Sequence, residues 1–333
     1  MMQRLSLEEL KNLVVKALVA HNTSEANAVH VAEALVAAEA DGQRGHGLSR
    51  LASYVAQARS GKVDGHVRPV VETRGDATLR IDAAGGFAYP AIAAAIERLP
   101  GLAKEHGIAI AGVAHSHHCG AAGYHVEQLA EQGLIGLFFS NTPEAIAPWG
   151  GNRALFGTNP IAFAAPRKGN DPLVIDLSLS KVARGKIKVA AQKGESIPEG
   201  WALDAEGNPT TDARAAMAGT MLPMGDAKGS ALVLMVEILA AALTASNFGF
   251  EASSFFEAEG PSPGIGQTLI AIAPDPLSNQ MFAERLEFLV EAILEQPGIR
   301  LPGARRFQLR KKAMEQGIEL EPSEYEELVA LGN

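Results

Sequence analysis

The hydrophobic pattern of the chain changes near Val67, and this change limits the folds that are open to it. Before that residue, apolar side chains recur at helical spacing in three stretches, at about 6–20, 24–40 and 48–61. After it, β-branched and apolar runs alternate with helical ones. We predict strands within 67–81 and at 108–113, 134–140, 161–164, 173–177 and 269–272, and helices at 91–102, 123–132, 229–245 and 279–294, with an exposed loop at 198–211. This order predicts a helical opening followed by an α/β core.

The composition is that of a globular protein with an ordinary core. Of the 333 residues, 47% are hydrophobic and 20% are charged, and the formal net charge is -9. A chain of this charge repels polyanions, so we expect no nucleic-acid partner. The single cysteine, Cys119, excludes an intrachain disulfide framework and fits a reducing, cytoplasmic location.

No stretch of the sequence has the pattern of an export signal or a membrane span. The first twenty residues mix apolar and charged side chains, unlike a signal peptide. The most apolar run, 231–245, contains Glu237 and is too short to cross a bilayer, so we expect a buried helix there and no membrane partner.

Familiar nucleotide and hydrolase motifs are missing. No G-x-G-x-x-G joins a strand to a helix with an acidic residue about 20 positions later, so an ordinary Rossmann domain is disfavoured. P-loop, H-E-x-x-H and G-x-S-x-G patterns are also absent.

A histidine and an arginine follow the second predicted helix. His46 lies between Gly45 and Gly47, and Arg50 follows about one turn later. Imidazole can donate a proton to the oxygen or nitrogen left by hydride addition, while a guanidinium can hold a carboxylate through two hydrogen bonds. The pair suits a 2-oxo or 2-imino acid. A surface loop with a solvated arginine is the plain alternative.

Histidines gather after the strand predicted at 108–113, at a carboxyl strand end where ligands collect in α/β proteins. Five histidines and Cys119 fall between His106 and His125. Zinc, and with it a zinc-dependent hydrolase or lyase, therefore stays open. Against one shared metal, consecutive His117 and His118 on an extended segment should point to opposite faces. A metal-free cofactor or substrate contact and a structural role are the other interpretations.

Further stretches carry groups that suit anions and amides, although each also has a purely structural reading. Thr158 lies in a tight turn, and Asp176 lies at the end of an apolar strand. Lys228 opens an apolar helix, where free amides and the helix dipole attract phosphate. Arg305, beside a proline–glycine turn, is a candidate for a second phosphate contact.

Together these stretches resemble the second, non-Rossmann family of malate and L-lactate dehydrogenases. That family also contains ureidoglycolate dehydrogenase, 2,3-diketogulonate reductase and the Δ1-piperideine-2-carboxylate/Δ1-pyrroline-2-carboxylate reductases. The resemblance runs nearly end to end. It is carried by the D-G to H-G-L-x-R loop at 41–50, the two histidines at 117–118, and the stretches 156–160, 176–178, 222–230 and 301–303.

The resemblance implies an α/β protein with a non-Rossmann nicotinamide-binding fold and a largely antiparallel sheet. It implies helical N- and C-terminal segments that pack together (1–75 with 279–333), an α/β core at 76–278 that binds cofactor and substrate, and a homodimer. His46 is implied as the proton donor, and Arg50 and Thr158 as substrate ligands. The implied cofactor positions are His118, Cys119, Gly120, Ala121, Ala122, Asp176, Leu177, Ser178, Ala227, Lys228, Gly303, Ala304 and Arg305.

Two positions depart from the family pattern. Where the imino-acid reductases have a serine before the histidine and a later aspartate, which form a proton relay, this chain has Gly45 and Lys186. The proton path to His46 must then use water, Lys186 or another histidine. The segment 247–268 nevertheless resembles the imino-acid reductases. We therefore expect an NAD- or NADP-dependent enzyme, NADPH slightly favoured, that reduces a cyclic 2-imino acid; a 2-hydroxy-acid dehydrogenase is the alternative.

Overall fold

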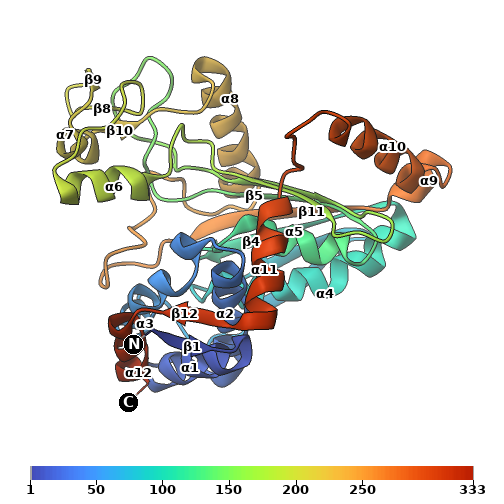
Figure 1. Cartoon of the computed structure of the whole chain (residues 1–333), viewed down its shortest axis with the longest axis horizontal. Helices are drawn as coiled ribbons and strands as arrows, with labels where there is room; N and C mark the ends of the chain where they lie inside the picture. The colour runs from blue at the N-terminus through green and yellow to red at the C-terminus, as the bar shows by residue number, and fades with distance from the viewer. Residues whose placement is uncertain (1, 333) are drawn as a thin grey trace.

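A seven-stranded sheet forms the centre of the protein, in a computed structural model that describes residues 2–332 (Figure 1). Its strand order is β2-β3-β4-β11-β5-β6-β7, and every neighbouring pair is antiparallel except β3 and β4. The strands are β2 (Val70–Gly75), β3 (Thr78–Asp82), β4 (Ile108–Ser116), β5 (Ile135–Ser140), β6 (Ile161–Ala165), β7 (Leu173–Leu177) and β11 (Ile265–Ile272). The predicted α/β fold with a largely antiparallel sheet is confirmed.

Helices cover both faces of this sheet. On one face, α4 (Ala88–His106) and α5 (Ala122–Ala130) pack against inward side chains such as Phe138 and Leu269. On the other face lies α8 (Asp226–Glu237), which continues into a π-helical turn, Ile238–Ala242. That turn approaches β11 closely, because a Cβ at Gly266 would meet the carbonyl oxygen of Ala240 at 2.0 Å. Glycine is therefore required where helix and strand meet.

The N-terminal helices form a second core, as their apolar spacing predicts. Ser6 caps α1 (Leu7–Ala20) with a capping box, and Ser24 caps α2 (Glu25–Ala40). The third helix, α3 (Leu51–Ser60), ends at Gly61 in the left-handed conformation. The C-terminal segment packs on these helices through α11 (Ala304–Gln316), through α12 (Pro322–Leu331), and through the pairing of β1 (Gln3–Leu5) with β12 (Ile318–Leu320) (Figure 1).

A buried charge cluster fixes α11 to the other elements. The Arg310 guanidinium donates to both oxygens of Asp41, at 2.7 and 2.8 Å, and also to Glu127, while Arg306 pairs with the same two carboxylates. In contrast, α9 (Pro274–Ser278) and α10 (Phe282–Leu294) lie at the far end of the sheet, where Arg167 pairs with Glu287 at 2.8 Å (Figure 1). The division into 1–75 with 279–333 and 76–278 stays a proposal.

A third unit stands beside the sheet. It contains α6 (Arg184–Lys193), α7 (Ala213–Ala218), and a small sheet of β8 (Ala202–Leu203), β9 (Pro209–Thr210) and β10 (Thr220–Met221). The predicted loop at 198–211 is therefore not only loop, because β8 and β9 pair within it.

The helix predicted to be buried at 231–245 is not fully buried. It packs along one side, while Ile238 is 52% and Leu243 58% exposed. Within residues 2–332, none of the helices is both long and apolar enough to cross a membrane.

Candidate active site

His46 and Arg50 sit on two short 3-10 turns between α2 and α3, Arg44–His46 and Leu48–Arg50. The buried carboxylate of Glu39, on α2, holds this loop by accepting from the Leu48 amide at 3.1 Å. Burial raises the pKa of Glu39. Arg50 Nε donates to the carbonyl of Gly45 at 2.7 Å, so the guanidinium is tied to the residue that precedes the histidine. The structure thus brings His46 and Arg50 together.

A bulge at the end of β4 aims the next two histidines at the same site. Ile265 pairs with Ser116 and Gln267 with Val113, so two residues of β4 lie opposite the single Gly266. His115 in the bulge takes a positive φ of 51° and turns its ring to Asp82, 3.0 Å away. The strand ends at Ser116, so the expectation that His117 and His118 point to opposite faces is wrong: both rings pack against Tyr54 and Phe255.

The ring of His118 lies beside that of His46, with centroids 5.5 Å apart and the planes nearly parallel. Nδ1 of His118 and the Tyr54 hydroxyl share a hydrogen bond of 2.5 Å, and Tyr54 contacts the Tyr89 hydroxyl at 3.0 Å. These hydroxyls fix the orientation of His118 and, through the ring contact, the surface on which His46 rests.

Burial and a neighbouring cation keep His46 neutral. Burial first, and then the charge of Arg50, lowers the pKa of His46 to about 4. The same two causes hold the pKa of His118 well below its ordinary value. Nδ1 of His46 is buried without a hydrogen-bond partner among the described residues. The Lys186 side chain, at one of the two positions that depart from the family pattern, is exposed and makes no hydrogen bond or ion pair within 2–332.

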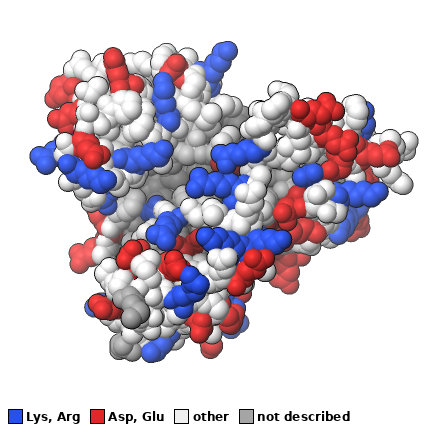
Figure 2. Space-filling view, viewed as in Figure 1, with Lys and Arg blue, Asp and Glu red and all other residues white. Residues whose placement is uncertain are grey.

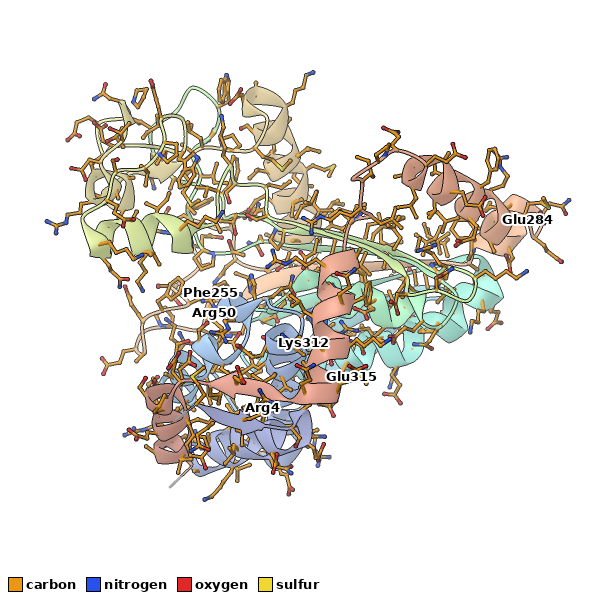
Figure 3. All side chains as sticks on the ribbon, viewed as in Figure 1. Arg4, Arg50, Phe255, Glu284, Lys312 and Glu315 are labelled. Carbon is orange, nitrogen blue, oxygen red and sulfur yellow. The ribbon has the colours of Figure 1, made fainter. Side chains whose placement is uncertain are left out.

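A buried lysine that sequence analysis did not single out shapes another wall of the site. Lys62 is only 3% exposed, and its ammonium donates to the carbonyls of Ser254 at 2.6 Å and Glu257 at 3.0 Å. Gln57 on α3 also donates to carbonyls of this loop, including that of Phe255 at 2.8 Å. The loop therefore carries Phe255 against the two histidines, close to Arg50 (Figure 3).

Thr158 is placed by a second buried group, Glu237. The Glu237 carboxylate accepts from Asn159 Nδ2 at 2.7 Å, from the Gly249 amide at 2.7 Å and from Asn141 Nδ2 at 3.2 Å. Three loops around the site thus meet on one side chain, and burial raises its pKa. The Thr158 amide donates to the Thr142 hydroxyl oxygen at 2.9 Å. The sequence signal for Glu237 is a single acid in the apolar run 231–245, which by itself does not reveal the partners of the carboxylate.

The Thr158 loop is also linked to the segment after β7. The Thr158 carbonyl accepts from the Leu179 amide at 2.8 Å. The segment after β7 lies beside residues 222–224, since Lys181 donates to the Leu222 carbonyl and the Met224 amide to that of Leu179, both at 2.8 Å. Thr158, Ser178 and the start of α8 therefore belong to one wall.

Several predicted cofactor positions line one cavity of about 450 Å³. Asp176, Gly303 and Arg305 lie on its wall, together with Arg300 and Arg306. Asp176 also accepts from the Gly123 amide at 2.8 Å, at the start of α5, and burial raises its pKa. The segment 118–122 is buried and leads into the same helix. Ala227 and Lys228 are exposed at the start of α8 and do not line this cavity.

The histidine cluster does not converge as metal ligands do. Across the described part of the chain, no group of three or more His, Cys, Asp or Glu side chains is arranged to hold a metal ion. Cys119 is buried as a free thiol, its carbonyl accepts from His125 Nε2 at 2.8 Å, and burial raises the thiol pKa to about 12. The geometry therefore offers the zinc hydrolase or lyase no support.

Comparison with known proteins decides the family. Residues 5–329 match the malate/L-lactate dehydrogenase family along almost the whole chain. The chain belongs to this family. It is 54% identical to (2R)-3-sulfolactate dehydrogenase (NADP(+)) of Chromohalobacter salexigens, over 99% of this chain and 98% of that protein. It is 42% identical to Δ1-pyrroline-2-carboxylate/Δ1-piperideine-2-carboxylate reductase of Pseudomonas syringae pv. tomato, over 99% and 96%.

A solved structure of a similar protein has the same fold. The crystal structure of Δ1-piperideine-2-carboxylate reductase from Pseudomonas syringae superposes with a TM-score of 0.94 at 42% identity, and the match covers 99% of both chains. The chain is accordingly an NAD(P)-dependent oxidoreductase, as the sequence predicted.

The residues present fit a nicotinamide dinucleotide without a Rossmann glycine motif. The cavity of about 450 Å³ is within the usual size range of ligand pockets, and Arg300 and Arg305 line it for phosphate groups. The uncapped start of α8 leaves free amides beside Lys228. Figure 2 shows Lys and Arg side chains around the hollow centre of this face, although the whole chain is acidic.

Replacing Glu237 should test how far the site depends on one buried carboxylate. We expect Glu237→Ala to lower the free energy of unfolding by about 2–4 kcal/mol, because three buried donors lose their acceptor. Urea denaturation measures this. Glu284→Ala, at an exposed position on α10 (Figure 3), is the control and should change stability by less than about 0.5 kcal/mol. Equal effects of the two variants would contradict the role of Glu237.

Proposed function

We propose that the protein is an NADP-dependent oxidoreductase that interconverts a small 2-hydroxy acid bearing a sulfonate at C3, of the 3-sulfolactate type, and the corresponding 2-oxo acid. The observation that carries the proposal is the pairing of a neutral imidazole, His46, with the Arg50 guanidinium, which has no carboxylate partner among residues 2–332. The first group can exchange a proton at the C2 oxygen, and the second can bind the neighbouring carboxylate.

The choice of acid and cofactor rests on the 54% identity to the NADP-dependent sulfolactate enzyme of Chromohalobacter salexigens. Gly45 and Lys186 add to it, because they replace the serine and the aspartate of the imino-acid reductases' proton relay, and Nδ1 of His46 has no hydrogen-bond partner among residues 2–332. A cyclic 2-imino acid, our expectation from the sequence, becomes the second candidate. It is supported by the 42% identity to the Pseudomonas syringae reductase and by that structure's TM-score of 0.94.

In the proposed mechanism, Arg50 and Thr158 hold the C1 carboxylate and so orient C2 toward the cofactor. A bound nicotinamide would supply the hydride acceptor for oxidation at C2 and the hydride donor for reduction. His46 takes the hydroxyl proton during oxidation and gives it back during reduction. His118, fixed by Tyr54, supports the His46 ring. The residues proposed to hold the cofactor are His118 to Ala122, Asp176 to Ser178, Ala227 with Lys228, and Gly303 to Arg305.

A substrate panel tests the proposal directly. NADP+ and NAD+ are reduced with 3-sulfolactate, malate and lactate, and NADPH and NADH are oxidised with Δ1-piperideine-2-carboxylate and Δ1-pyrroline-2-carboxylate. We expect the highest kcat/KM with 3-sulfolactate and NADP+. A higher kcat/KM with either imino acid would favour the second candidate, and no turnover of any 2-hydroxy acid would reject the proposed function.

The pH profile should carry the signature of His46. Oxidation needs the unprotonated imidazole, so kcat/KM for oxidation should be level near neutral pH and fall as the pH drops toward the His46 pKa of about 4. Reduction needs the protonated form, so its kcat/KM should rise as the pH falls. His46→Gln should lose about a hundredfold or more in turnover while still binding NADP+. Unchanged turnover, or an unchanged pH profile in this variant, would remove His46 from the role.

We also propose a homodimer, formed at least in part by the exposed side of the helix at 231–245. Leu232, Met235, Ile238 and Leu243 present an apolar stripe there, and each is between 39% and 58% exposed. An isologous interface would bury this stripe against its copy. Cytoplasmic location remains an expectation from the composition.

Light scattering after gel filtration tests the dimer. The native protein should have twice the mass of the chain, and Ile238→Glu combined with Leu243→Glu should shift it toward the monomer. The control is Leu277→Glu on α9, an 83% exposed leucine outside the stripe, which should stay dimeric. A native protein with the mass of one chain would refute this part.

A further inference from the structure

Lys188, on α6, and Arg50 both lie near the ring of Phe256. We propose that Lys188 binds the second acidic group of the substrate, at C3, and so selects dianionic over monoanionic 2-hydroxy acids. This inference rests on the proposed function and names a specificity-determining residue for it.

The first observation is that both cations lie on one aromatic ring. The Arg50 guanidinium lies 4.9 Å from the centroid of Phe256, and the Lys188 ammonium lies 5.4 Å from the same centroid. Arg50 comes from the N-terminal helical part and Lys188 from the third unit, so two separate parts of the fold bring positive charge to one place. Phe256 is 59% exposed, so the two cations meet at the open side of the site.

The second observation is that Phe256 is held in place. Its loop is fixed by the buried Lys62 ammonium and by Gln57, and the Ser60 hydroxyl adds a hydrogen bond of 2.6 Å to the carbonyl of Ala258. The residue before it, Phe255, is 7% exposed and packs on His117 and His118. The ring that carries the two cations is therefore part of the same rigid wall as the proton-transfer residues.

The third observation is that the charges are not compensated. Neither Arg50 nor Lys188 forms an ion pair with a carboxylate anywhere in residues 2–332. Two like charges near one ring repel each other, and an anion between them removes that repulsion. In an acid of the sulfolactate type, one carbon separates the C3 sulfonate from C2. A carboxylate on Arg50 then leaves the second acid close by, where a second cation is needed.

Helix geometry singles out Lys188 among the basic residues of α6. Residues two apart on a helix point in widely different directions, so Lys186 cannot share the face of Lys188, whereas Arg184, four residues earlier, can. Arg184 donates to the carbonyl of Glu144 at 3.5 Å and is directed to another loop. Lys188 is the residue of this helix that contacts the ring beside Arg50.

The test compares dianionic with monoanionic substrates in charge variants of the full-length enzyme. For Lys188→Gln, kcat/KM with 3-sulfolactate should fall about tenfold or more, mainly through KM, while kcat/KM with lactate changes less than about twofold. Lys188→Arg keeps the charge and should restore the preference for 3-sulfolactate. Lys193→Gln, at the last residue of the same helix, also removes one exposed positive charge and should leave the preference unchanged.

Two failures can be told apart. If the native enzyme oxidises 3-sulfolactate and the ratio of kcat/KM between 3-sulfolactate and lactate is the same in Lys188→Gln, the role of Lys188 is overturned and the proposed function stands. A ratio that falls equally in Lys193→Gln also overturns it, because the effect is then general electrostatic attraction. If the native enzyme oxidises no 2-hydroxy acid, the proposed function itself fails.

Discussion

The carboxylate of Glu237 is the interaction on which the arrangement of the site most depends. Three loops that no sheet or helix organises end on its two oxygens, through Asn141, Asn159 and Gly249. Loops at an active site have few backbone hydrogen-bond partners of their own. A buried acceptor supplies such partners, as a neighbouring strand does within a sheet. Lys62 fixes another loop of the site, 254–257, by donating to its backbone carbonyls. These fixed walls then let His46 and Arg50 face the substrate.

The electrostatics of the site follow from burial and from a surplus of positive charge. The pKa of His46 falls to about 4, because burial and Arg50 both disfavour the imidazolium. A bound anion would offset Arg50 and make protonation of His46 easier, so substrate binding and proton transfer are coupled. The basic hollow of Figure 2 lies in a chain of net charge -9, so this local field is a property of the site and not of the whole protein.

Much of the fold was predictable, because periodicity and caps are local signals. Ser6, Ser24 and Gly61 bound their helices where the sequence placed them, and the apolar runs became the strands of the central sheet. The site was predictable only in its parts. The bulge at His115 depends on pairing with β11, about 150 residues away, and it turned His117 and His118 to one side. Lys62 and Glu237 have no motif, since their partners lie on distant loops: backbone carbonyls for Lys62, and two side-chain amides and one backbone amide for Glu237.

The most direct measurement of the central claim is a crystal structure of the protein with NADP+ and an unreactive analogue of the 2-hydroxy acid. The account predicts that Nε2 of His46 lies within hydrogen-bonding distance of the C2 oxygen, that the Arg50 guanidinium grips the C1 carboxylate, and that the nicotinamide ring faces C2 from the side of 118–122. An analogue bound with its C2 oxygen directed away from His46, or a nicotinamide lodged far from both residues, would contradict it.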